Sequence, residues 1–199
     1  MIKFDVILPG RGVMTANDFF NSIKGPMLNE LRKVGRNDIR ADFNATVATW
    51  VKKPKFEVHP SAAGNVLGIS IRPDDMPIEG YSGDATHDDA SPGRIWDWID
   101  RGTGSEVGGK KYPIEVKDET KELWLPAFYT PKTTPKFVGS GPGGEGKSHP
   151  SGKKVLHPGI KPRLWTEEIA KTWTEKMPWI AAQLQDTLND LVKKSGLGL

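Results

Sequence analysis

The longest helical pattern in this sequence lies in residues 157–194, HPGIKPRLWTEEIAKTWTEKMPWIAAQLQDTLNDLVKK. Its apolar side chains recur at steps of three or four, which places them on one face of a helix that must be buried. Glu167 and Glu168 favour the positive N-terminal end of such a helix, and Pro162 suits its first turn. We therefore expect a long C-terminal helix that packs through a stripe of apolar side chains: Trp165, Ile169, Trp173, Met177, Ile180, Leu184, Leu188 and Leu191.

One proline interrupts this helix. Pro178 removes a backbone donor, so it either kinks the helix or divides it in two. The stripe keeps its phase across Pro178, which favours the kink. Lys193 and Lys194 suit the negative C-terminal end, and Gly196 can end the helix. If the stripe is buried, replacing Trp173 by Ala should cost about 3–5 kcal/mol.

The composition is that of a single globular domain. The chain has 199 residues, 36% of them hydrophobic, with seven tryptophans and seven phenylalanines to fill a core. The formal net charge of +3 is too small to indicate nucleic-acid binding by itself. The absence of cysteine excludes disulfides, thiolate metal sites and a cysteine nucleophile. With no apolar run near the roughly 20 residues of a membrane helix and no signal-peptide pattern at the N-terminus, we expect a soluble protein.

The N-terminal half predicts a strand, two helices and a hairpin. Residues 2–8 alternate apolar and charged side chains, which predicts a strand closed by Pro9-Gly10. After a cap at Thr15 and Asp18, helical spacing predicts one helix before Gly35, bent at Gly25-Pro26, and a second helix that ends before Pro54. Their apolar positions are Phe19, Ile23, Met27, Leu31 and Val34, then Ile39, Phe43, Val47, Trp50 and Val51. Period-two alternation at 56–59 and 67–72 predicts a β-hairpin.

The C-terminal half predicts one short helix, two short strands and a long loop. Ile95, Trp96 and Ile99 have helical spacing within residues 93–104, and Gly102 can end that helix. The strands carry Ile114 and Val116, then Leu123 and Leu125. Residues 130–156 are rich in Gly, Pro, Ser, Thr and Lys, as in a functional or disordered loop.

Together these patterns predict an α+β fold. A small antiparallel sheet is packed by N-terminal helices and a long, proline-kinked C-terminal helix. The chain is expected to be one domain, residues 1–199, with an extended loop or arm at about 130–156.

One segment matches a nucleotide-binding pattern. Residues 141–148, GPGGEGKS, satisfy the phosphate-loop formula G-x-x-x-x-G-K-[ST]. That loop works only between a buried strand and a helix whose N-terminus faces the phosphates. Pro135 precedes the match and Pro150 follows it, where neither element is predicted. We therefore expect a flexible Gly-rich loop and no nucleotide binding.

Other combinations of polar residues give no catalytic or metal site. The acidic residues 74–89, with His87, supply oxygen and imidazole ligands but lack the spacing of a calcium loop, and they favour a solvated loop. Asp97 and Asp100 share a helix face, but the neighbouring arginines, Arg94 and Arg101, favour surface ion pairs. No G-x-S-x-G elbow is present. Trp50, Trp165 and Trp173 follow helical spacing and are assigned to the core.

The basic charge is concentrated in the loop 130–156. Five lysines face a single glutamate there, for a net charge of +4; the residues are Lys132, Lys136, Lys147, Lys153, Lys154 and Glu145. The loop is expected to present positive charge to an acidic neighbour or to DNA. It is either an arm that becomes ordered on assembly, which we favour, or a spacer that never becomes ordered.

Four motifs, in order along the chain, resemble the neck and tail-completion (head–tail joining) proteins of tailed double-stranded-DNA bacteriophages. They are TVATWVKKPKF at 46–56, IWDWIDRGTG at 95–104, YTPKT at 129–133 and HPGIKPR at 157–163. In that family a Gly-Thr turn, a Gly/Ser-rich loop and an HPG turn into a C-terminal helix recur in this order. The resemblance spans roughly residues 36–190. This chain has Leu164-Trp165 where family members often have Phe.

The resemblance implies a structural virion protein of the phage neck or tail. It implies a homo-oligomeric, six-fold ring that completes the tail or joins it to the head, assembled in the host cytoplasm. Its partners would be the connector or stopper, the terminator and the tail tube, with DNA nearby in the lumen and no membrane. No enzyme activity, catalytic residue, cofactor or metal is implied. The expected interface residues are Gly102, Thr103, Lys132, Lys136, Lys147, Lys153, Lys154, His157, Pro158, Gly159 and Arg163.

Two alternatives stay open at this point. The chain could be a tail-terminator ring subunit, which is a different layer of the same assembly. It could instead be a nucleic-acid-binding or hydrolytic enzyme that uses the basic loop and the acidic residues. A ring subunit should form a multimer or assemble on a partner, whereas an enzyme has no such need.

Overall fold

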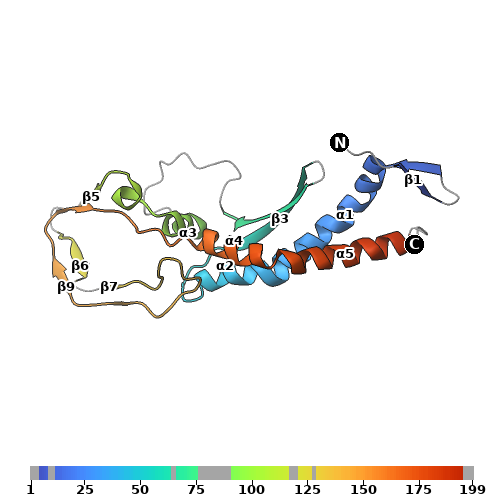
Figure 1. Cartoon of the computed structure of the whole chain (residues 1–199). Helices are drawn as coiled ribbons and strands as arrows, with labels where there is room; N and C mark the ends of the chain where they lie inside the picture. The colour runs from blue at the N-terminus through green and yellow to red at the C-terminus, as the bar shows by residue number, and fades with distance from the viewer. Residues whose placement is uncertain are drawn as a thin grey trace. The chain divides into compact units, whose positions relative to one another are not determined.

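The computed structural model describes residues 5–8, 12–63, 66–75, 91–116, 121–126 and 129–194 (Figure 1). The fold is α+β, with helices, small antiparallel sheets and a long C-terminal helix, as the sequence predicts. The chain forms two compact units that alternate along the sequence. The first unit contains Met1–Ala41, Glu57–Arg72 and Thr172–Leu199, and the second contains Asp42–Phe56 and Pro73–Lys171.

The first unit is built from a long helix pair and two hairpins. Strand β1 (Asp5–Leu8) pairs antiparallel with β2 (Gly12–Thr15), and α1 (Ala16–Val34) follows directly. Helix α1 packs against α5 (Met177–Lys194). The predicted hairpin is confirmed as β3 (Phe56–Ala63) and β4 (Val66–Pro73), a two-stranded sheet. Thr15, expected as a helix cap, is the last residue of β2.

The core of the first unit lies between these elements. Its buried apolar side chains are Met27, Leu31, Val34, Ile39, Val58 and Ile180. Gly35 is buried where the helix meets the hairpin, and an added Cβ there would lie 2.5 Å from a methyl of Val58. Gly35 therefore allows a close contact between helix and hairpin. It does not break the helix, in contrast to the sequence prediction.

The second predicted helix is shorter than its apolar spacing suggests. After α1 the chain forms a π-helical turn, η1 (Gly35–Ile39), and then the short helix α2 (Arg40–Thr46). The Val47 and Trp50 amides then bond to carbonyls three residues back, at 3.2 and 3.0 Å. These tight turns end the helix eight residues before Pro54, so the assignment of Trp50 and Val51 to a helix is wrong.

The C-terminal helix is divided near Pro178. Helix α4 (Trp165–Glu175) ends one residue before Lys176, and α5 begins at Met177 with Pro178 in its first turn. The division, not the favoured kink, is therefore observed, because a proline fits the first turn of a new helix. The apolar stripe does not survive this break intact: Met177 is 54% exposed and Trp173 is only half-buried. Glu167, Glu168, Lys193 and Lys194 occupy the helix ends as predicted.

In the second unit, residues 42–56 are followed along the chain by α3 (Pro92–Arg101), which ends at Gly102 as predicted, and by the short η3 (Gly104–Val107). The predicted strands are confirmed as β5 (Tyr112–Glu115) and β6 (Trp124–Pro126). Four more strands follow: β7 (Tyr129–Thr130), β8 (Gly144–Glu145), β9 (Ser148–Pro150) and β10 (Lys154–His157).

These strands form nested antiparallel pairs. Strand β5 pairs with β10, β6 with β9, and β7 with β8. Residues 112–157 are therefore one interrupted two-stranded ribbon, which extends away from α3 in Figure 1. Residues 130–156, predicted as an extended loop or arm, thus contain the short strands β8, β9 and β10. Pairs of two to four residues leave almost no periodicity in the sequence, so the spacing did not predict β8 and β9.

The core of the second unit is aromatic. Trp96 contacts Phe43, Phe56 and Trp165, with ring centroids 5.9, 5.2 and 6.0 Å away. Both tryptophan indoles are hydrogen-bonded: Trp96 Nε1 donates to Thr46 Oγ1 at 2.8 Å, and Trp165 Nε1 donates to the Phe137 carbonyl at 3.0 Å. This second bond ties residues beyond β7 to the start of α4.

Candidate interface pocket and turn junction

Two of the motifs quoted above, at 95–104 and 157–163, meet in the second unit. The Thr103 amide donates to the Ile160 carbonyl at 2.9 Å, and the Ile160 amide donates to Thr103 Oγ1 at 3.0 Å. The Ser105 amide and hydroxyl both donate to the Pro158 carbonyl, at 2.6 and 2.8 Å. We call this contact between residues 102–105 and residues 157–160 the turn junction. It closes the base of the ribbon against the C-terminal end of α3.

Glycine is required on both sides of the turn junction. Gly102, Gly104 and Gly159 have φ angles of 78, 65 and 115°, which side chains rarely adopt. An added Cβ on Gly159 would overlap the Thr103 carbonyl oxygen, and one on Gly104 would press on the Pro158 carbonyl. These glycines are therefore explained by contacts within the chain.

His157 and Pro158 also take part in contacts within the chain. The His157 ring stacks on Tyr112, with centroids 5.1 Å apart, and its Nδ1 accepts a hydrogen bond from the Gly159 amide at 3.0 Å. A smaller pocket of about 390 Å³ opens beside them, lined by Trp98, Thr103, Gly104, Gly109, Lys110, Tyr112 and Ile160.

Arg163 anchors the segment that follows β7. Its side chain is 9% exposed, and Nε donates to Thr133 Oγ1 at 2.8 Å while Nη1 donates to the Lys161 carbonyl at 3.0 Å. The Lys136 amide donates to the Arg163 carbonyl at 2.8 Å. Arg163, predicted at an interface, thus joins the returning segment to the approach of α4.

The two carboxylates of α3 have different environments. Asp97 pairs with Arg101 at 2.8 Å, as predicted. Burial raises the pKa of Asp97, against the lowering effect of Arg101, and the Asp100 charge raises it further. Asp100 is buried and accepts from the Thr166 amide and hydroxyl at 3.1 and 2.5 Å. The prediction of a surface ion pair at Asp100 is wrong, because this carboxylate instead caps the first turn of α4.

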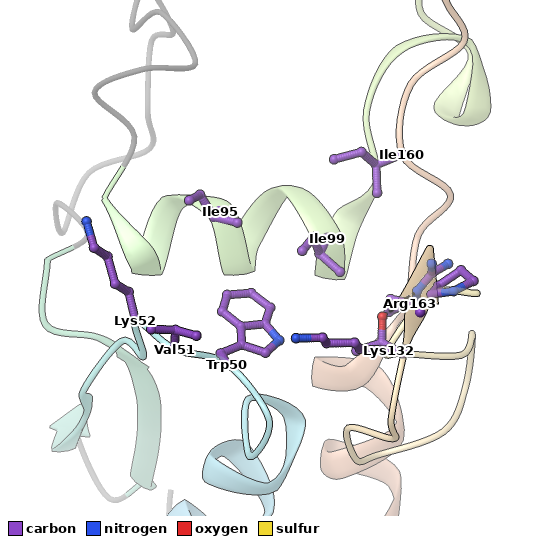
Figure 2. A pocket seen from close by; sticks show the side chains of 12 residues that line it. Trp50, Val51, Lys52, Ile95, Ile99, Lys132, Ile160 and Arg163 are labelled. Atoms are coloured by element: carbon purple, nitrogen blue, oxygen red, sulfur yellow. Dashed lines mark hydrogen bonds between the residues drawn. The ribbon is translucent and has the colours of Figure 1, made fainter. Parts of the chain in front are cut away.

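A pocket of about 730 Å³ lies between the residues that follow α2, helix α3 and the segment after β7 (Figure 2). Its residues are Trp50, Val51, Lys52, Ile95, Ile99, Pro131, Lys132, Thr133, Gly143, Gly144, Ile160 and Arg163. We call it the basic pocket. Figure 2 shows the Trp50 ring below Ile95 and Ile99, with Lys132 extending toward the indole. Val51 is 97% exposed and Ile95 is 38% exposed.

The charge of the basic pocket has one sign. Lys52, Lys132 and Arg163 contribute cations, and none of the described residues that line the pocket is acidic. An apolar floor with a cationic rim suits a ligand that carries both apolar groups and negative charge.

The predicted lysines lie on different segments of the second unit. Lys132 lines the basic pocket, and Lys136 is exposed in the segment after β7. Lys147, Lys153 and Lys154 are exposed on the ribbon, where Lys154 forms an ion pair with Glu115 across β10 and β5. The phosphate-loop pattern runs from residue 141 into β9, so a strand follows its Lys-Ser pair where a nucleotide site needs a helix.

The acidic residues 76–89 lie outside the described residues. Over the described part of the chain, no three acidic or histidine side chains gather as metal ligands would, and no helix is long and apolar enough to span a bilayer.

Sequence reasoning missed the basic pocket. Trp50 was assigned to a core helix, whereas it is half-buried in the pocket wall. The signal available was the run Lys52-Lys53-Pro54, which places charge and a helix breaker directly after Trp50. The sequence alone does not show which face of α3 is exposed. That Ile95 and Ile99 lie toward the pocket follows only from the buried position of Trp96 in the structure.

Comparisons of this chain with family models, with curated proteins and with solved structures find no match.

Proposed function

We propose that this chain is a structural subunit of the neck or tail end of a tailed double-stranded-DNA bacteriophage, where copies of it form an oligomeric ring. The observation that carries the proposal is the turn junction. The Gly-Thr and HPG motifs, on which the family resemblance rests, are hydrogen-bonded to each other at the base of the ribbon. The two motifs thus have a structural role together within one unit, which supports reading them as parts of one architecture.

The ribbon gives a second line of support. A two-stranded ribbon is marginally stable in water unless a further strand or another surface packs against it. Yet Trp124 is 62% exposed in β6 and Leu156 is 60% exposed in β10. Large apolar groups on a ribbon with open strand edges favour association with another chain. A neighbouring subunit in a ring would cover them.

The solution mass of the purified protein tests this proposal. We expect a multimer in sedimentation velocity and rings in negative-stain micrographs, alone or after addition of tail tubes. Phage particles produced without this protein should contain filled heads and separate tails. A protein that stays monomeric, does not bind heads or tails and is absent from complete particles would contradict the proposal.

A double variant tests whether the exposed apolar side chains of the ribbon mediate assembly. Replacing Trp124 and Leu156 by Ser should abolish assembly while the circular dichroism spectrum of the free chain stays unchanged. Val66 is 63% exposed in β4 of the first unit, so Val66→Ser is the matched control for loss of an exposed apolar group and should assemble normally.

A further inference from the structure

The residues that line the basic pocket specify the chemistry of a ligand that would bind there. We infer that the pocket binds the acidic segment of a neighbouring copy of this chain, residues 74–89. This inference rests on the proposed ring, and it names the contact that would join adjacent subunits.

The pocket side of this contact combines exposed apolar surface with cations. Ile95 and Ile99 project from α3 above the Trp50 ring, and Val51 is almost fully exposed beside them (Figure 2). Lys52 and Lys132 carry the positive charge. Among the residues that the structure describes, neither lysine is paired with an acidic side chain.

Arg163 differs from these two lysines. It is already hydrogen-bonded to Thr133 and to the Lys161 carbonyl, so it contributes a fixed positive charge to the wall. Lys52 and Lys132 are exposed and can reach a ligand. They are therefore the residues whose change should affect binding without disturbing the fold.

The chain itself contains the complementary sequence. Residues 74–89, DDMPIEGYSGDATHDD, hold six acidic residues, and none of the chain's 28 lysines and arginines lies within them. Met76, Ile78 and Tyr81 provide apolar side chains within the same stretch. This one segment complements the pocket in both respects. Its carboxylates can pair with the lysines, and its apolar side chains can cover Trp50.

The symmetry of a ring explains why the occupant belongs to a neighbour. In a ring of more than two subunits, each interface joins two different patches of the same chain. A basic pocket and an acidic segment are such a pair. The segment starts at a defined point on the second unit, because the Asp74 amide donates to the Lys55 carbonyl at 2.9 Å and Asp75 accepts from the Gly93 amide at 3.0 Å.

DNA is the other polyanion available to a neck protein, but the floor of the pocket disfavours it. A duplex presents phosphates and keeps its bases stacked, so it leaves the exposed apolar surface of Trp50, Val51 and Ile95 uncovered. Phosphate binding also needs no apolar floor. We therefore assign the pocket to the peptide segment and treat DNA binding as an outcome of the test.

Engineered disulfides test the contact directly, since the chain has no cysteine. One chain carries Pro131→Cys at the exposed edge of the pocket, which leaves Lys52 and Lys132 in place, and a second carries Thr86→Cys, which keeps every acidic residue of the segment. The two are mixed, oxidised under mild conditions and analysed on non-reducing gels with peptide mapping by mass spectrometry. The matched control replaces the first chain by Lys153→Cys, an exposed lysine on the ribbon away from the pocket.

We expect a cross-linked dimer that joins residue 131 of one chain to residue 86 of the other. Its yield should exceed that of the Lys153→Cys control about tenfold, and Lys52→Glu in the pocket chain should reduce it by a similar factor. High salt should weaken the contact, because the charged rim is exposed.

Three results would overturn the inference. The first is the absence of a bond between residues 131 and 86. The second comes from a third variant that carries both cysteines: a bond that forms only within that one chain, and not between the two singly substituted chains. The third is loss of the cross-link on addition of duplex DNA whose binding is itself abolished by Lys52→Glu, which would assign the pocket to DNA.

The inference and the proposed function fail separately. Rings without the cross-link would leave the proposed function standing and contradict the pocket contact. Cross-linked pairs from a protein that never forms rings or joins particles would support the pocket contact and contradict the neck assignment.

Discussion

At the scale of single residues, the turn junction places the strictest demand on the sequence. Gly159 has a φ of 115°, and its α-carbon faces the Thr103 carbonyl oxygen with no room for a side chain. Thr103 in turn binds Ile160 through both its amide and its hydroxyl. The backbone conformation at Gly159 therefore determines whether the ribbon closes at its base.

We predict that Gly159→Ala destabilises the second unit. The backbone strain alone should cost about 1–3 kcal/mol, and the overlap with the Thr103 carbonyl adds to it. Gly144 has no atom within 4 Å of an added Cβ, so Gly144→Ala is the control and should be nearly neutral. Urea unfolding followed by tryptophan fluorescence measures both. Equal midpoints for the two variants would show that the turn junction does not contribute to stability.

At the scale of secondary-structure elements, the start of α4 is more important than its end. Trp165 is fully buried, stacks on Trp96 and donates to the Phe137 carbonyl. Asp100 caps the same turn through Thr166. Trp173, near the end of α4, is half-buried and has Trp179 and Lys176 as neighbours, at 6.3 and 4.3 Å.

We therefore predict that Trp165→Ala costs about 3–5 kcal/mol, because it leaves a cavity in an aromatic core and removes a partner of Phe137. Trp173→Ala should cost only about 1–2 kcal/mol, the value of one aromatic pair and one cation–π contact. Chemical denaturation of the two variants compares them. A larger loss of unfolding free energy for Trp173→Ala than for Trp165→Ala would contradict this and support the continuous buried stripe that the sequence suggests.

The elements predicted correctly from the sequence have strong local patterns. Helices α1, α3 and α5 follow amphipathic spacing, and β3 and β4 follow period-two alternation. Strands β7 to β9 were missed because their stability comes from partners far along the chain, as in the pairing of His149 with Leu125. The length of the second helix was overestimated because side-chain spacing does not reveal that Val47 and Trp50 form tight turns.

The candidate site was predicted only in part, for a related reason. The sequence identified the turns at Gly102 and Gly159 and the lysine at position 132, but it could not show that the two turns bond to each other. Nor could it show that Trp50 lies beside Ile95, since that contact joins segments separated by 45 residues. Pockets depend on such long-range packing, whereas motifs depend on local spacing.

At the scale of the whole molecule, the ribbon determines how the free and the assembled protein should differ. Its three pairs contain two, three and four residues on each strand, and Lys147 and Lys153 are exposed between them. Short pairs with exposed hydrogen bonds open locally at low free-energy cost. In the free subunit the ribbon should therefore admit a protease even though the remainder of the second unit is folded.

We predict that trypsin cleaves the free protein first after Lys147 and Lys153, and that assembly suppresses both cuts because a neighbouring subunit covers Trp124 and Leu156. Mass spectrometry of timed digests identifies the sites, and Lys147→Gln removes the first cut as a check of the assignment. A reporter peptide added to both samples shows that the protease is equally active in them. Protection of the ribbon in the particle means that its opening is linked to binding, so the free energy of assembly must include the cost of ordering it. Equal cleavage rates in free and assembled protein would mean instead that the ribbon is a spacer that contacts no neighbour.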